Sequence, residues 1–97
     1  MIEIIYRDHR FYEFPNMDAW DAKQATHERV FEEFGEDAEY KIDRIDEWEE
    51  DGENGTDIDV TVTVDKIYDV DSDDDALEMF ESEFPDYDSS QLDIIRY

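Results

Sequence analysis

Residues 54–64, with the sequence NGTDIDVTVTV, decide the fold class of this chain. Apolar side chains recur at every second position of this stretch, at Ile58, Val60, Val62 and Val64. This alternation predicts a strand with one buried face and one polar face. Asn54-Gly55 is a dipeptide typical of tight hairpin turns, so we expect the strand to pair with the segment before it.

The preceding segment, residues 38–48, has a strand pattern with a defect. Tyr40 and Ile42 alternate with polar residues, but the next apolar residues are Ile45 and Trp48. The alternation therefore slips near Arg44, as a β-bulge would require. We expect this segment to be a strand that is bulged near its middle.

Helical patterns lie on both sides of this hairpin. The first helix can begin at an N-cap, Asn16 or Asp18, and end at Phe34, because Gly35 suits the left-handed residue that often follows a helix. The second can begin after Ser72, because Ser72 and Asp75 have the spacing of a capping box. We expect the first helix to bury one arc of its surface, formed by Ala19, Trp20, Thr26, His27, Val30, Phe31 and Phe34.

Strand patterns occupy both ends of the chain. Residues 1–7 and 91–97 alternate, and Phe11–Phe14 can form an extra N-terminal hairpin strand after a turn at residues 8–10. The element order predicts an α+β fold, a ferredoxin-like βαββαβ two-layer sandwich whose antiparallel sheet carries two helices on one face. Ile5, Ile95 and Tyr97 would adjoin on the uncovered face, an apolar strip that suggests dimerisation or docking of Phe11–Phe14.

Length and composition favour one folded domain, residues 1–97. A chain of 97 residues is sufficient for a single two-layer core. Its mean hydropathy of −0.89 is typical of disordered chains. However, it has six Phe, six Tyr and two Trp, which supply the large apolar surfaces that disordered acidic tails lack. We therefore predict a folded protein.

Charge is the most unusual property of the sequence. The chain has 32 acidic and eight basic residues, giving a formal charge of −24. Residues 1–31 hold six acids and four bases, whereas residues 32–59 hold fourteen acids and two bases. Residues 65–93 hold twelve acids and one base. Such self-repulsion destabilises a compact state, and solubility requires a much smaller charge, so we expect the acidity to serve a function.

Several functional classes have no support in the sequence. Cysteine is absent, so thiolate catalysis and Cys-based zinc sites are excluded. No pair of acids is distinguished by an apolar pocket, and no Gly-rich phosphate loop or nucleophile motif is present, so we do not expect an enzyme. Residues 69–75 resemble a calcium loop, but the required Gly and bidentate Glu are missing, so we predict no metal site and no cofactor. The negative field also argues against direct nucleic-acid binding.

The spacing of the acids points to a basic partner. Acids two apart on a strand are separated by about 7 Å and acids one turn apart on a helix by about 5–6 Å, both close to the distance between neighbouring phosphates. The chain thus resembles the small acidic DNA-mimic inhibitors of phages and mobile elements, of the anti-restriction, anti-CRISPR and glycosylase-inhibitor type. That resemblance implies that it occupies the DNA-binding cleft of a basic DNA- or RNA-binding protein. The predicted contact residues are Asp43, Asp46, Glu47, Trp48, Glu49, Glu50, Asp51, Glu53, Asp57, Asp59, Asp65, Asp74, Glu78 and Glu81.

Trp48 is the expected anchor of this interface, because Trp is enriched at binding hot spots. A buried Trp of the core is the alternative reading of the same residue. No secretion signal or apolar run long enough to span a membrane is visible, so we expect a cytoplasmic protein, in the host-cell cytoplasm if it is phage-encoded. It can be a monomer or a homodimer.

Two alternatives to mimicry would also account for the acidity. A halophile's salt-adapted domain would be acidic and poor in Lys. However, salt adaptation would acidify residues 1–31 as strongly as the remainder. An acidic adaptor or chaperone for a basic protein would share the electrostatics without the phosphate-like geometry.

Overall fold

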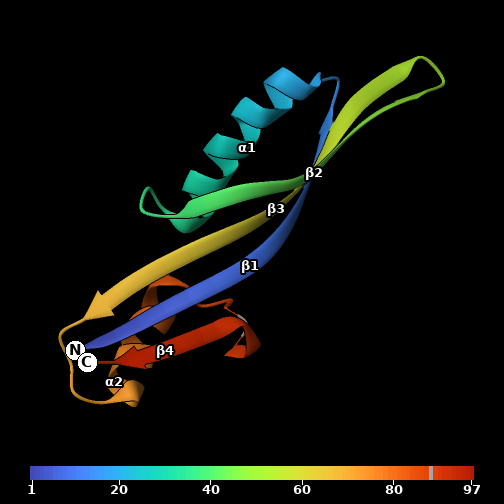
Figure 1. Ribbon diagram of the computed structural model, residues 1–97. Coiled ribbons are helices and arrows are strands. Elements are labelled where there is room, and N and C mark those ends of the chain that lie inside the picture. Colours follow the sequence, from blue (N-terminus) through green and yellow to red (C-terminus); the bar gives the residue numbers. More distant parts are fainter. Residues whose placement is uncertain (88) are drawn as a thin grey trace. The chain divides into compact units, whose positions relative to one another are not determined.

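The computed structural model describes residues 1–87 and 89–97 (Figure 1). The elements are β1 (Ile2–Pro15), α1 (Ala19–Phe34), β2 (Glu39–Glu50), β3 (Glu53–Tyr68), α2 (Asp73–Glu83), a short 3₁₀ helix (Ser89–Gln91) and β4 (Leu92–Arg96). The strands form one four-stranded sheet in the order β2-β3-β1-β4. The coarse prediction of an α+β fold with four antiparallel strands and two helices is therefore confirmed.

The chain divides into two compact units. The terminal unit comprises residues 1–8 and 63–97, and the central unit comprises residues 9–62. Strands β1 and β3 contribute to both units, whereas each helix belongs to one of them. Each unit has its own core.

The core of the terminal unit lies between α2 and the sheet. Strand β1 pairs antiparallel with β4, with Ile2 opposite Arg96 and Tyr6 opposite Leu92. Tyr6 is buried and meets Phe80 of α2 edge to face, with ring centroids 5.8 Å apart. Helix α2 begins as predicted, because the Ser72 hydroxyl accepts a hydrogen bond from the backbone N–H of the third residue after it.

The core of the central unit lies between α1 and the buried face of β3. Helix α1 begins at the Asp18 cap and is followed by Gly35, whose φ of 92° is in the left-handed region, as predicted. The buried residues of the helix form a narrow stripe at every fourth position, Ala22, Thr26, Val30 and Phe34. Trp20 and His27 were expected on the buried arc, but both are exposed, and Trp20 has 70% of its surface accessible. The predicted arc was displaced around the helix, because it omitted the buried Ala22 and included Trp20 and His27 on the other side of this stripe.

The predicted N-terminal hairpin is wrong. Strand β1 continues without a break through residues 8–10, and its buried apolar residues stay at even-numbered positions as far as Tyr12 and Phe14. Arg10 takes one of these even positions, where its guanidinium carbon lies 5.1 Å from the centre of the Phe34 ring. Its side chain therefore packs on α1, and the polar residues that suggested a turn belong to a strand.

Candidate functional site

The hairpin of β2 and β3 turns at a different dipeptide from the one predicted. Asp51 and Gly52 have φ angles of 51° and 82°, the positive values that a two-residue hairpin turn requires. The prediction of a turn at Asn54-Gly55 is wrong, because both residues lie within β3. Because the turn lies three residues earlier than predicted, Gly55 is part of β3 and lies directly beside the Trp48 ring.

Gly55 gives the Trp48 indole room to lie against β3. A Cβ atom at position 55 would be 2.5 Å from Cζ2 of Trp48 and 3.0 Å from the backbone oxygen of Phe14. Such distances are shorter than van der Waals contact, so any larger residue would displace the ring. A glycine inside a strand often marks a close approach of this kind.

A hydrogen bond fixes the orientation of the same indole. Trp48 Nε1 donates to Oδ1 of Asp57, two residues after Gly55 on β3, at 3.1 Å. The Trp48 side chain is only half-buried. The sequence left two alternatives open, a binding anchor or a core residue. The structure shows an indole that is packed on one strand and held by a carboxylate while part of its surface reaches solvent.

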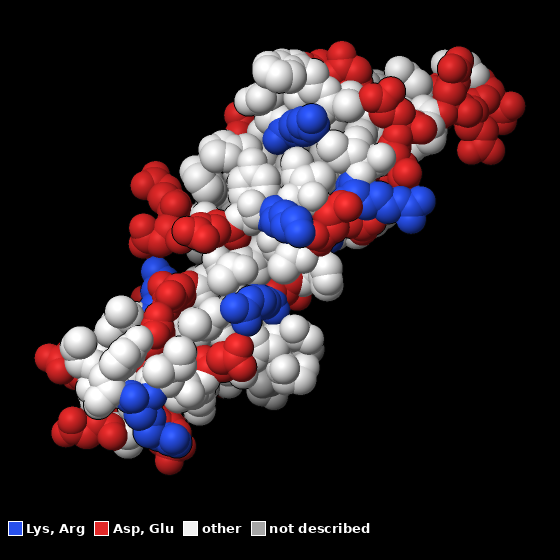
Figure 2. Space-filling view, viewed as in Figure 1, with Lys and Arg blue, Asp and Glu red and all other residues white. Residues whose placement is uncertain are grey.

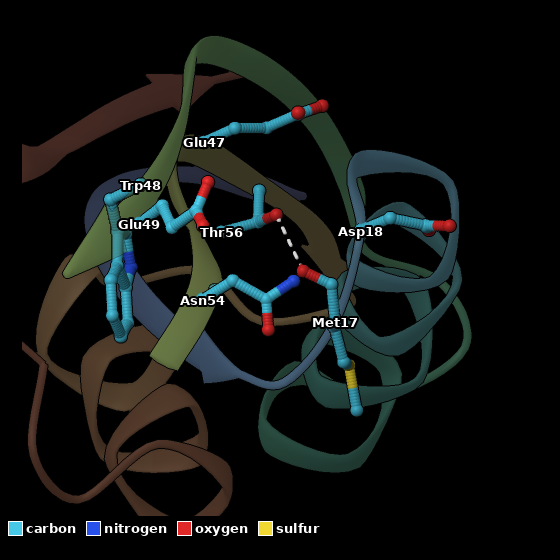
Figure 3. A pocket seen from close by; sticks show the side chains of 8 residues that line it. Met17, Asp18, Glu47, Trp48, Glu49, Asn54 and Thr56 are labelled. Atoms are coloured by element: carbon cyan, nitrogen blue, oxygen red, sulfur yellow. Dashed lines mark hydrogen bonds between the residues drawn. The ribbon is translucent and has the colours of Figure 1, made fainter. Parts of the chain in front are cut away.

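Two open hollows adjoin Trp48. One, of about 310 Å³, is lined by Met17, Asp18, Glu47, Trp48, Glu49, Asn54, Gly55 and Thr56. Figure 3 shows Trp48 on one side of it and Met17 and Asp18 on the other, with the Thr56 hydroxyl donating to the backbone oxygen of Met17 at 2.9 Å. The second, of about 400 Å³, is lined by Trp48 and five acids, Glu13, Asp46, Glu49, Glu50 and Asp57. An aromatic ring with carboxylates around it suits a cationic group.

The carboxylates at the end of the hairpin lack cationic partners. Among residues 1–87 and 89–97, no Lys or Arg forms an ion pair with Glu47, Glu49, Glu50, Asp51 or Glu53. All five are exposed. In Figure 2 acidic side chains cover the hairpin end at the upper right of the view, while the Lys and Arg side chains lie over other parts of this face. The hairpin end is therefore a region of strong negative potential.

Other predicted contact residues have local partners. Asp46 pairs with Arg44 at 2.7 Å. Asp43 accepts a hydrogen bond from the Thr61 hydroxyl at 2.6 Å. Asp59 is half-buried on β3. These residues border the hairpin end and are less available to an incoming cation.

The structure places the fourteen predicted residues in two groups. Ten of them, from residue 43 to residue 59, belong to the hairpin in the central unit. The other four belong to the terminal unit, with Asp65 on β3 and Asp74, Glu78 and Glu81 exposed on α2. The hairpin group surrounds Trp48 and lines the two hollows beside it, so it forms the candidate site.

One polar cluster was not predicted. His9 Nδ1 lies 3.3 Å from the Thr61 hydroxyl and 3.7 Å from an oxygen of Asp43. A hydroxyl, an imidazole and a carboxylate are the groups of a nucleophilic triad, but here the hydroxyl donates to the carboxylate at 2.6 Å. A triad requires the hydroxyl to donate to the imidazole, so this cluster is not arranged to activate Thr61. The three residues come together because β2 pairs with β3 and β3 pairs with β1. Local sequence patterns do not reveal strand pairing, so the cluster could not be predicted from them.

Metal ligation and a membrane-spanning helix find no support in the described part of the chain. Within residues 1–87 and 89–97, no three His, Asp or Glu side chains are arranged to hold a metal ion. Neither helix in that part is long and apolar enough to cross a membrane. Comparison with protein-family models, with curated proteins and with solved structures found no match for this chain.

Proposed function

We propose that this protein is a DNA-mimic inhibitor that inserts the end of its β2–β3 hairpin into the basic nucleic-acid-binding cleft of a host defence or DNA-processing protein. The observation that carries the proposal is the set of five exposed carboxylates without cationic partners around a half-buried, oriented Trp48. On this proposal the protein is not an enzyme and acts in the cytoplasm, which is the host's if it is phage-encoded.

The exposed carboxylates would raise the rate of association with the partner. Unpaired surface charges attract an oppositely charged cleft over distances of about 10 Å at physiological salt, and such attraction raises association rates by factors of about 10–1,000. Two bases in the hairpin region, Lys41 and Arg44, lie away from the turn along β2. The exposed carboxylates near the turn would therefore enter the cleft before these two bases.

Trp48 would lower the rate at which the complex dissociates. An Arg or Lys side chain from the cleft would stack on the solvent-facing part of the indole and contact carboxylates of the second hollow, such as Glu13 and Glu49. Packing on Gly55 and the bond to Asp57 hold the ring before binding, so little conformational entropy is lost when the partner arrives. Interactions formed after contact change the dissociation rate more than the association rate.

The ferredoxin-like class of the fold is also part of the proposal. It rests on the order of strands and helices along the chain. An experimentally determined structure would test it through the position of each strand in the sheet and the face on which each helix packs.

A displacement assay tests the proposed function. A fluorescent DNA duplex is bound to purified members of three classes, a restriction enzyme, a CRISPR effector and a repair glycosylase, and this protein is then added. We expect it to release the DNA from at least one class, and less effectively as salt rises. Binding to such an enzyme while the DNA stays engaged would contradict mimicry and favour an acidic adaptor.

The matched variants make this assay specific to the hairpin. The hairpin variant replaces Glu47, Glu49 and Glu50 with Gln. The control variant makes the same change in charge at three exposed acids of the same unit, in or just after α1, Glu28, Glu32 and Glu36. The hairpin variant should lose displacement and the control variant should keep it.

A further inference from the structure

The sheet face of the terminal unit opposite α2 carries exposed apolar side chains. Within residues 1–8, the buried apolar residues of β1 are even-numbered and Tyr6 packs on α2, so the odd-numbered residues belong to the opposite face. Met1 and Tyr97 adjoin there, because the Tyr97 N–H donates to the backbone oxygen of Met1. Ile95 lies opposite Glu3 in the register of β1 and β4. The two chain ends meet beside this face in Figure 1.

Strand β3 extends the same face on the other side of β1. The buried residues Val62 and Val64 of β3 are even-numbered, so Asp65 and Ile67 belong to the opposite face, like the odd-numbered residues at the start of β1. Strand β3 is a neighbour of β1 in the sheet. Ile67, Met1 and Tyr97 therefore share one face of the sheet, and they are 58%, 53% and 73% exposed. Ile95 of β4, on the same face, is 39% exposed.

Acidic groups lie within this apolar face. The Glu3 carboxylate accepts a hydrogen bond from the Tyr97 hydroxyl, and this bond lowers the pKa of Glu3. The carboxylate is therefore ionised at neutral pH, although Glu3 is only 9% exposed. A group docked over the face would remove the remaining contact of the Glu3 carboxylate with water. This desolvation is costly unless the docked group supplies a cation that pairs with the carboxylate.

The unit as a whole has the same sign of charge. Residues 1–8 and 63–97 contain fourteen acids and three bases. Each of the three bases lies against an acid of the unit, Arg7 with Asp93, Lys66 with Glu83 and Arg96 with Asp73. A second copy of the chain would bring a further charge of −24 to this face and the same ionised Glu3.

We propose that this face, named here the terminal apolar face and formed by Met1, Glu3, Ile67, Ile95 and Tyr97, binds a segment of a basic partner protein in which apolar side chains are flanked by Lys or Arg. The apolar residues of the segment cover the isoleucines, and a cation pairs with the Glu3 carboxylate. Charge complementarity selects this occupant over a second copy. The face belongs to a different unit from the hairpin, and the inference does not depend on the function proposed for the hairpin.

Two synthetic peptides test the proposal. One is an amphipathic helix of Leu and Lys, and the other has Ser in place of every Leu, with the same length and charge. Their affinities for the full chain are measured by fluorescence anisotropy at physiological ionic strength. The wild-type protein should bind the Leu/Lys peptide at least about tenfold more tightly than the Ser/Lys peptide, because only the first can cover the apolar residues.

Variants of the terminal apolar face test whether this face is the source of the preference for the Leu/Lys peptide. Ile67→Ser combined with Ile95→Ser should remove the preference for the Leu/Lys peptide and leave binding of the Ser/Lys peptide unchanged. Met79→Ser is the matched control, since Met79 is a 47% exposed apolar residue on α2 of the same unit. It should keep the preference. If circular dichroism shows that the double variant is unfolded, Ile67→Ser alone serves, because this side chain is already largely exposed.

Three results would overturn the proposal. One is equal affinity of the wild-type protein for both peptides, and another is a preference that survives in the Ile67 and Ile95 variants. The third is a wild-type dimer in sedimentation that becomes a monomer on the double substitution, which would identify a second copy as the occupant. The hairpin variant at Glu47, Glu49 and Glu50 should retain the peptide preference, so failure of the hairpin function and failure of this proposal are distinguishable.

Discussion

Substituting Gly55 with Ala would place a methyl group in the space that the Trp48 indole occupies. The added carbon would lie 2.5 Å from Cζ2 and 2.7 Å from Cε2 of the ring, so the ring must move. Overpacking of this kind costs about 1–3 kcal/mol. Movement of the ring also breaks the Nε1 bond to Asp57, which contributes about 1 kcal/mol. Ala is preferred over Gly in a strand by about 0.5–1 kcal/mol, so we expect Gly55→Ala to lower the free energy of unfolding by about 1–3.5 kcal/mol in total.

Urea denaturation of single and double variants measures this effect. Trp20 is exposed on α1, so Trp20→Phe gives a background in which fluorescence reports on Trp48 alone. In that background Gly55→Ala should also shift the emission of Trp48 to longer wavelength. When Trp48 is replaced by Ala, the cost of Gly55→Ala should fall below about 0.5 kcal/mol or change sign, because Ala is preferred over Gly in a strand by about 0.5–1 kcal/mol. An undiminished cost would refute the reasoning, since the indole would not then be the obstacle.

Further predictions concern the turn, a buried tyrosine and salt. Gly52→Ala should cost about 1–2 kcal/mol because its φ is 82°, whereas Asn54→Ala should stay within about 0.5 kcal/mol; equal costs in urea denaturation would contradict the turn assignment. Burial and the nearby Glu83 carboxylate raise the pKa of Tyr68 to about 12. Stability should therefore be unaffected by this group below pH ~10 and fall as the pH rises to about 12, with a smaller slope in Tyr68→Phe; an unchanged slope would exclude Tyr68 as the source. Thermal melts followed by circular dichroism should show a folded protein in dilute buffer as well as in concentrated KCl, and unfolding at low salt would favour salt adaptation.

Periodic patterns and helix caps could be predicted from the sequence because they are local. Residues 58–64 of β3 alternate as expected, and the register slip in β2 is visible in the half-buried positions Tyr40, Ile42, Ile45 and Trp48. The Asp18 and Ser72 caps need only the hydrogen bond to a backbone N–H three residues later. Nothing distant in the chain is required for either feature.

The errors at the hairpin turn, in β1 and in the acidic surface depend on contacts between distant residues. Asp51-Gly52 and Asn54-Gly55 are both favourable turn dipeptides, and the space required by Trp48 across the hairpin distinguishes them. The polar residues 8–10 resemble a turn until Arg10 is seen to pack on α1. The acidic surface was predicted as one set of residues, and the structure divides it between two units because strand pairing and helix packing assign each residue its place.

The association rate of the hairpin variant tests the central claim most directly. Stopped-flow mixing with the enzyme identified by the displacement assay would compare the variant with Gln at 47, 49 and 50 and the control with Gln at 28, 32 and 36. Both variants lose three charges from the central unit, so they differ only in where the charge is removed. We predict an association rate about tenfold lower for the hairpin variant and within about twofold of wild type for the control. Equal reductions in the two variants would show that total charge, and not the hairpin end, directs binding.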